Sequence, residues 1–227
     1  AMASSTSLRD PGANHVRPFM PPAVLGAALF TALYMLAAGL AAAAKGNTEF
    51  AFYAIVMLII IAALLWLHWR VRLSSGVIWG LALWGALHMA GGLMPVPAHL
   101  AQGEGPAVLY SLWLSPMGEQ IGLLKYDKAV HAFGFAVTTW LCWQALLGAV
   151  GLRRPTFGLM VLCVAAAMGF GALNEVIEFL ATRLTETNVG GYYNTSLDLV
   201  ANLLGAVLAA AMICLMPQRD TAGKERE

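Results

Sequence analysis

Long apolar runs alternate with short polar segments along the chain. Six of these runs are about as long as the ~20 mainly apolar residues that a transmembrane helix requires. They are Ala23–Ala44, Phe50–Trp69, Gly76–Met94, Lys128–Val150, Thr156–Thr182 and Ser196–Met216. The pattern predicts an all-α, polytopic membrane protein with six transmembrane helices.

Polar tails flank the predicted membrane domain. Residues 1–21 form the first tail and 217–227 the second, which leaves 22–216 as a single six-helix domain. Its longest connection is the loop 95–126. Within this loop, the apolar pattern of Pro106–Met117 predicts an interfacial or re-entrant helix.

Basic residues are distributed unevenly between the two sides of the predicted bundle. Cytoplasmic loops of membrane proteins carry an excess of Lys and Arg. One side has Lys45, Lys125, Lys128 and Arg183. The other has Arg9, Arg17, Arg70, Arg72, Arg153, Arg154, Arg219, Lys224 and Arg226. We therefore expect both termini to be cytoplasmic and the loop 95–126 to face outward.

Composition supports the membrane assignment and excludes other classes. Of the 227 residues, 59% are hydrophobic and only 11% are charged, whereas a soluble globular domain carries about 25% charged residues. An ordinary water-soluble enzyme is therefore excluded. The formal net charge of +1 argues against a nucleic acid partner. The expected partner is the lipid bilayer.

Ionisable residues inside the spans gather at one depth. Each charged side chain in a span costs roughly 2.5–3.5 kcal/mol on the insertion scale, so it requires a partner or a role. Four helices contribute such residues or their polar neighbours near their outward ends: His88; Asp127 and His131; Glu175 and Glu178; Asp198 and Asn202. By helix rise they should lie within about 10 Å of one another in depth. This predicts a polar cavity that opens outward.

Four carboxylates in one cavity require neutralisation, because like charges at close range cannot all ionise. A divalent metal, retained protons or a basic side chain could each provide it. Lys128 is expected to point outward, because it is turned about 100° from Asp127 on the helix and its stem is long. Arg183 is expected to cap the site from the end of its span.

Metal is the neutralising group that best fits the available side chains. Imidazole with carboxylate oxygens suits zinc, iron or manganese. The predicted ligands are His88, His131, Glu178 and Asp198. Glu175 would act as the general base, and Asp127 would orient His131.

The leading functional hypothesis is a metal-dependent membrane enzyme, a hydrolase or transferase that acts on a lipid or lipid-linked substrate. The predicted substrate contacts are Tyr192, Asn194 and Asn202. One alternative is a non-catalytic transport or binding protein with protonatable carboxylates. Another is a purely structural polar cluster that holds the helices together.

Each polar residue also has a structural explanation when it is taken alone. His88 could be a hydrogen-bonded core histidine, and Asp198 could cap the sixth span. Glu175 and Glu178 could bond to hydroxyls such as those of Thr138 and Thr139. Their convergence from four helices nevertheless favours a functional site.

Glycines mark further positions of close approach. The pairs Gly91–Gly92 and Gly190–Gly191 allow the backbone to turn sharply or approach another group. Gly169, Gly171 and Gly205 are expected at helix-packing positions.

Three motifs carry a resemblance to a known family. The opening Asp127-Lys128-Ala129-Val130-His131-Ala132-Phe133, the glutamate helix Asn174–Phe179 and the closing segment Asn194–Ala206 resemble VanZ-like membrane proteins. Ala86–Gly92 is closer to the YjdF-like branch, although Gly92–Pro95 departs from its histidine–tyrosine stretch. The resemblance implies a multi-pass protein of the bacterial inner membrane with an outward-facing acidic and histidine site.

Overall fold

The computed structural model describes residues 21–46, 48–101, 107–115, 124–151, 154–184 and 191–216. Within these ranges, six helices are long and apolar enough to cross a membrane. They are α1 (Pro22–Lys45), α2 (Thr48–Val71), α3 (Ser75–Leu93), α5 (Tyr126–Val150), α6 (Phe157–Leu184) and α7 (Tyr192–Leu215). The described residues form no strand, so the all-α, six-helix prediction is confirmed.

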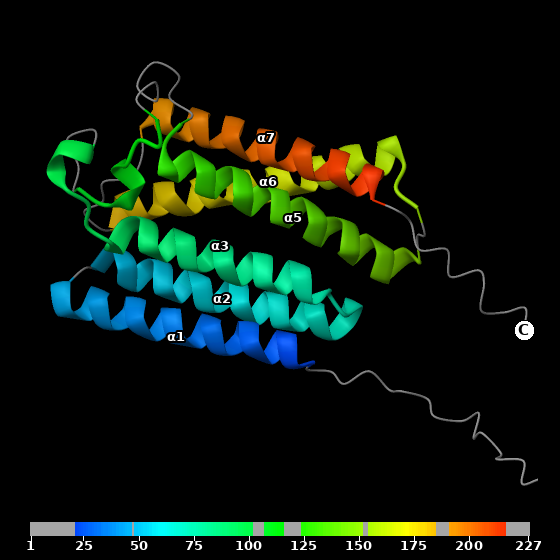
Figure 1. Ribbon diagram of the computed structural model, residues 1–227, viewed down its shortest axis with the longest axis horizontal. Coiled ribbons are helices and arrows are strands. Elements are labelled where there is room, and N and C mark those ends of the chain that lie inside the picture. The colour runs from blue at the N-terminus through cyan, green and yellow to red at the C-terminus, as the bar shows by residue number, and fades with distance from the viewer. Residues whose placement is uncertain are drawn as a thin grey trace, which may run out of the picture.

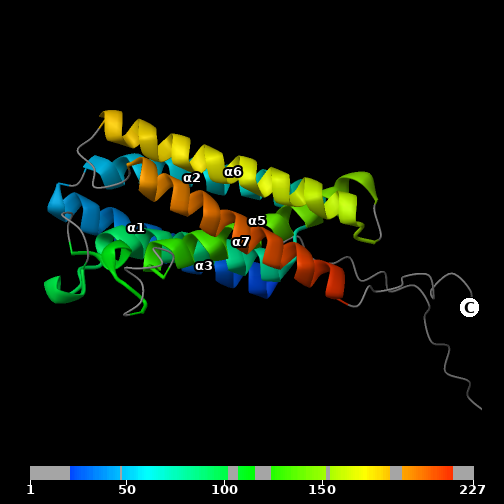
Figure 2. The same cartoon turned by 90° about the horizontal axis from the view of Figure 1, so that it is seen from above.

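The helices lie roughly parallel to one another in two groups. α1, α2 and α3 form one group and α5, α6 and α7 the other, with α3 packed against α5 between them (Figure 1). The beginning of α1 and the end of α7 lie at the same end of the bundle (Figures 1 and 2). At the opposite end, which we call the loop end, α3 and α6 finish and α5 and α7 begin.

Local sequence explains several helix boundaries. Pro22 occupies the first turn of α1, where a missing N–H costs nothing. Gly46 and Gly151 follow α1 and α5 with left-handed φ angles of 60° and 67°, which glycine adopts without strain. Ser74 caps α3 by accepting a hydrogen bond from the Val77 N–H at 3.4 Å.

The loop between α3 and α5 differs from its prediction. Of the expected helix Pro106–Met117, the structure describes 107–115, and there only Leu109–Ser111 forms a short 3-10 turn. Backbone pairing explains the difference. Leu109 N–H donates to Met94, and Tyr126 N–H donates to Leu112. These bonds to the neighbouring helix ends hold this stretch extended on either side of the turn, so it does not form a helix.

Glycine brings α5 and α7 into close contact. A Cβ atom at Gly205 on α7 would collide with the backbone carbonyl of Ala132 on α5. Gly171 similarly leaves room for the side chain of Asn202. Gly169 has open space around its Cβ position. The predicted packing role therefore holds for Gly205 and Gly171 but is wrong for Gly169.

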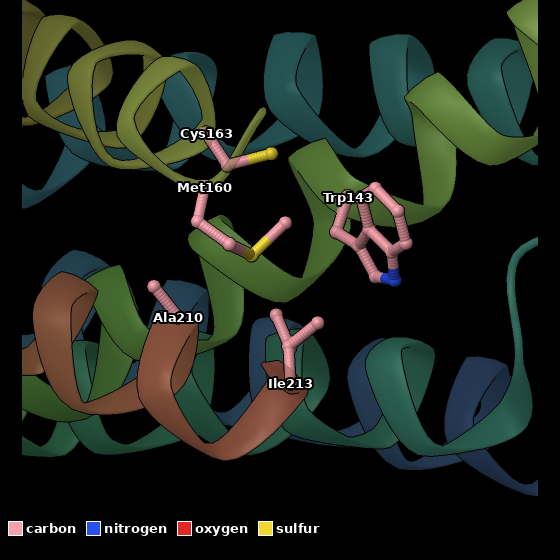
Figure 3. Packing of buried hydrophobic residues seen from close by; sticks show 5 residues of the cluster. All are labelled: Trp143, Met160, Cys163, Ala210 and Ile213. Atoms are coloured by element: carbon pink, nitrogen blue, oxygen red, sulfur yellow. The ribbon is translucent and has the colours of Figure 1, made fainter. Parts of the chain in front are cut away.

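An apolar cluster fills the space between α5, α6 and α7 away from the loop end (Figure 3). Its buried members are Trp143, Met160, Cys163, Ala210 and Ile213. Trp143 comes from α5, and the other side chains come from the first two turns of α6 and the last two turns of α7. This half of the three-helix group is therefore an ordinary apolar core.

Candidate functional site

A buried lysine organises the polar residues at the loop end. The Lys128 side chain is only 2% exposed. Its ammonium donates to Asp127 Oδ2 at 2.7 Å, to Asp198 Oδ1 at 2.5 Å and to Asn194 Oδ1 at 2.8 Å. An ammonium has three hydrogens, so these three oxygens satisfy it completely.

The prediction that Lys128 points outward is wrong. Its four-carbon stem folds back far enough to reach Asp127, the preceding residue. The approach of α7 then supplies Asp198 and Asn194 as further acceptors. The carboxylates predicted in the cavity called for neutralisation by a metal, by retained protons or by a basic side chain, and Lys128 supplies a basic side chain to two of them. Arg183, the expected cap, is exposed and makes no ion pair with the cluster among the described residues.

His131 lies between two sets of oxygen atoms. Its Nε2 is 3.5 Å from Asp198 Oδ1 and 3.7 Å from Asp127 Oδ1. Its Nδ1 donates to Asn202 Oδ1 at 3.0 Å and lies 4.0 Å from Glu175 Oε1. The imidazole therefore joins the lysine-bound aspartates on one side to the α6 carboxylates on the other.

The two α6 carboxylates have different surroundings. Glu178 Oε1 accepts a hydrogen bond from Asn174 Nδ2 at 2.8 Å. Glu175 is 9% exposed, yet neither of its carboxylate oxygens has a hydrogen-bond partner among the described residues. A buried carboxylate without partners is costly, so Glu175 is the least satisfied charged group of the cluster.

The structural alternative for the two glutamates, hydrogen bonds to threonine hydroxyls, is not what the structure shows. Thr138 and Thr139 donate instead to the backbone carbonyls of Gly134 and Phe135 on their own helix. The structural explanation for Asp198, that it caps the sixth span, is also wrong. α7 begins at Tyr192, four residues before the predicted start, so Asp198 lies inside the helix and cannot cap it.

A pocket of about 210 Å³ reaches the two glutamates. It lies between α6 and the start of α7. Its lining comprises Glu175, Glu178, Phe179, Thr182, Gly191, Tyr192 and Thr195. Tyr192 is 91% exposed and Phe179 62% exposed, so both present aromatic surface outside the bundle. The pocket gives the buried carboxylates a route to the exterior.

The predicted substrate contacts separate into two kinds. Tyr192 lines the pocket. Asn194 donates to Asp198 Oδ2 at 2.7 Å while accepting from Lys128. Asn202 is fully buried against His131. Asn194 and Asn202 thus bond to the cluster itself, while Tyr192 remains available to a substrate.

Two groups of side chains have the geometry to hold a metal ion. Asp127, His131 and Asp198 form one, and His131, Glu175 and Glu178 form the other. Within each group, the three ligand atoms lie within 4.8 Å of one another. The ammonium of Lys128 already bonds to both aspartates of the first group. Among the described residues, no lysine or arginine pairs with the second group, which adjoins the pocket.

His88 belongs to neither group. Its ring packs edge-on against Tyr53 and Tyr110, with ring centroids 6.3 and 5.6 Å away, and lies tilted against Trp84. Tyr110, in the loop, donates from its hydroxyl to the His88 backbone carbonyl at 2.8 Å. Burial, reinforced by the negative charge of Asp127, raises the pKa of Tyr110 well above its ordinary value. The hydroxyl therefore keeps its proton and remains a donor.

Sequence reasoning missed Asn174 and Tyr110 as well as Lys128. Asn174 lies one turn before Glu178, at the spacing that places two side chains on one helix face. Tyr110 lies in the loop, and its partner is a backbone atom, so no pattern of side chains could have revealed it. Gly91 makes room for the Tyr110 ring, which confirms the predicted close approach there.

Replacing Tyr110 with phenylalanine should destabilise the protein modestly. The change leaves the His88 carbonyl without its donor, and a net hydrogen bond contributes about 0.5–1.5 kcal/mol. Tyr193→Phe is the matched control, because Tyr193 is 72% exposed. Thermal unfolding in detergent should show a lower midpoint for Tyr110→Phe alone. Equal midpoints would mean that this bond does not anchor the loop to α3.

Comparison with known protein families shows which family the chain belongs to. The family described as "Predicted membrane protein (DUF2238)" matches residues 25–219. The chain belongs to this family. Comparisons with curated proteins and with solved structures gave no match.

Membership of DUF2238 agrees with the six spans and with the YjdF-like part of the resemblance. The VanZ-like part stays a prediction. The match covers five of the six helices completely and α1 from residue 25 onward, so every polar residue of the cluster lies within the matched segment. The DUF2238 description assigns no activity, and the chemistry must be argued from the site.

Proposed function

We propose that this membrane protein is a divalent-metal-dependent enzyme, a hydrolase or transferase, that acts on a lipid or lipid-linked substrate. One observation carries the proposal. Glu175 is buried without a hydrogen-bond partner among the described residues, and one of its carboxylate oxygens lies within 4.8 Å of a ring nitrogen of His131 and a carboxylate oxygen of Glu178. A cation bound there would satisfy all three side chains at once.

The chemistry of these ligands suits a borderline divalent ion. One imidazole with two carboxylates is a donor set used by zinc, iron and manganese. Such an ion would activate a water molecule or polarise a substrate oxygen. Nδ1 now donates to Asn202, so this nitrogen could bind metal in the other neutral tautomer, which carries its proton on Nε2.

The pocket supports a substrate that is partly apolar. Its polar floor is formed by the two glutamates, and its rim includes Phe179 and Tyr192. Next to it, α6 exposes large apolar side chains such as Val176 and Leu180. A lipid could lie against this apolar face while its headgroup enters the pocket. We further propose that the loop end faces outward from a bacterial inner membrane, as the basic residues predict.

The apolar cluster argues against the transport alternative. A path for ions or polar solutes would need polar side chains through the whole depth of the bundle. Between α5, α6 and α7, the half away from the loop end is instead closed by Trp143, Met160 and Ile213, among others (Figure 3). An apolar core beneath the polar cluster favours chemistry at the loop end.

Metal analysis of the purified protein tests the proposal. After equilibration with zinc and removal of the excess, we expect about one ion per chain in the wild type. Glu175→Gln and Glu178→Gln should each abolish most of this binding, because an amide is a much weaker ligand than a carboxylate. Glu49→Gln is the control, since Glu49 lies at the same end of the bundle on α2, outside both metal-compatible groups.

The enzymatic part requires a separate measurement. The zinc-loaded protein should release headgroups from lipid or lipid-linked substrates in mixed micelles, and a chelator should stop the release. No bound metal in the wild type, or equal metal in wild type and Glu178→Gln, would contradict the metal site. Metal at the proposed position without turnover of any lipid substrate would contradict the enzyme assignment.

A further inference from the structure

The two metal-compatible groups share one residue, His131. In two-metal hydrolytic sites, two ions lie about 3.5–4 Å apart and act on the same substrate. Here two ligand groups adjoin through the imidazole of His131, but the Asp127–His131–Asp198 group already contains a positive charge. The ammonium of Lys128 bonds to both of its carboxylates.

We infer that Lys128 is a built-in cation that occupies the second cation position of this cluster and closes the Asp127–His131–Asp198 group to metal ions. This inference rests on the proposed metal at His131, Glu175 and Glu178. The wild-type protein then binds a single metal ion, and the lysine supplies the second positive charge permanently.

Three observations support this role. The ammonium is satisfied by three oxygen atoms, two of them from carboxylates. Its side chain is 2% exposed, so neither water nor a free cation readily displaces it. Asn194 also holds Asp198 from the other oxygen. A metal ion could enter this group only by expelling a buried, fully bonded ammonium.

The arrangement also explains the division of charge in the cluster. The lysine offsets one of the two aspartate charges beside it, whereas no lysine or arginine in the described part of the chain pairs with Glu175 or Glu178. A divalent ion is therefore attracted to the glutamate side. His131 lies between the two sides. Its imidazole therefore has the Lys128 ammonium near one edge and the bound ion at the other.

Removing the lysine charge should open the second position. Lys128→Met keeps the length of the stem but leaves two buried aspartates without a cation. After equilibration with zinc, we expect elemental analysis to give about two ions per chain for Lys128→Met and about one for the wild type. Zinc should also raise the thermal midpoint of Lys128→Met more than that of the wild type, because the added ion replaces the lost ammonium.

Two controls separate this effect from general loss of charge. Lys125→Met removes a lysine three positions earlier that makes no ion pair with the cluster within the described part of the chain, and it should bind the same amount of zinc as the wild type. Lys128→Met combined with Asp127→Asn removes one ligand of the opened group. This double variant should return to about one ion per chain.

The outcomes distinguish the two proposals. Two ions in Lys128→Met and one in the wild type support both. One ion in Lys128→Met and none in the wild type would overturn the glutamate site but support the role of the lysine. Equal zinc in both proteins would overturn that role, whatever the wild type binds. Failure to recover folded Lys128→Met even in zinc would also overturn it, because metal should then replace the missing charge.

Discussion

Gly205→Ala should sharply destabilise the protein, by about 3 kcal/mol, at the upper end of the usual range for overpacked positions. The added methyl group would collide with the carbonyl of Ala132. Because the colliding atom belongs to the backbone of α5, no side-chain rotation can relieve the contact, and the two helices must move apart. The separation would also pull Asp198 from Lys128 and Asn202 from His131.

Gly169→Ala is the matched control for this substitution. Gly169 is also a glycine inside a membrane helix, but its Cβ position is open. Alanine there removes backbone freedom from the unfolded chain and should leave stability unchanged or slightly higher. Unfolding by a denaturing detergent, followed by circular dichroism, measures both variants. Similar midpoints for the two would refute the close α5–α7 contact.

Asp198→Asn should also cause a large loss of stability, about 3–5 kcal/mol, as expected when one partner of a buried ion pair is removed. Asp198 is fully buried, and it accepts from both Lys128 and Asn194. The asparagine side chain has one oxygen, so it cannot accept both of these hydrogen bonds. The Lys128 ammonium is then left with Asp127 as its carboxylate partner. Because the lysine keeps metal from this group, the variant should still bind zinc.

Glu49→Gln controls for the loss of a carboxylate at the loop end. It should shift the unfolding midpoint far less than Asp198→Asn does, because Glu49 has no ion-pair partner in the cluster. Loss of zinc from correctly folded Asp198→Asn would show instead that Asp198 is a metal ligand, as the sequence predicted. Unchanged stability would show that the buried ion pair is weak.

Hydropathy predicted the helices well because lipid requires each spanning segment to satisfy its own backbone. The boundaries were less accurate at the loop end. α7 begins at Tyr192 and not at Ser196, since polar residues can continue a helix once it leaves the apolar layer. Hydropathy detects that layer, not the end of the helix.

The candidate site was predicted in position but only partly in its contacts. Helical spacing correctly brought His131 to Asp127 and placed Glu175 and Glu178 on one helix. It could not predict which way Lys128 points, because that depends on how closely α7 approaches. The approach is set by Gly205, whose role becomes visible only when its partner Ala132 is known.

His88 shows a different limit of the sequence argument. Depth alone placed it with the other polar residues, but depth does not fix the direction around the helix axis. The aromatic residues Tyr53, Trp84 and Tyr110 surround its ring. Their contacts depend on the packing of α2, α3 and the loop, which no single helix pattern contains.

The position of a bound ion is the most direct test of the account. Crystals of the wild-type protein equilibrated with zinc should give one anomalous-scattering peak per chain, in contact with His131, Glu175 and Glu178. A peak between Asp127 and Asp198, where Lys128 now lies, would contradict the account, and so would the absence of any peak at the loop end.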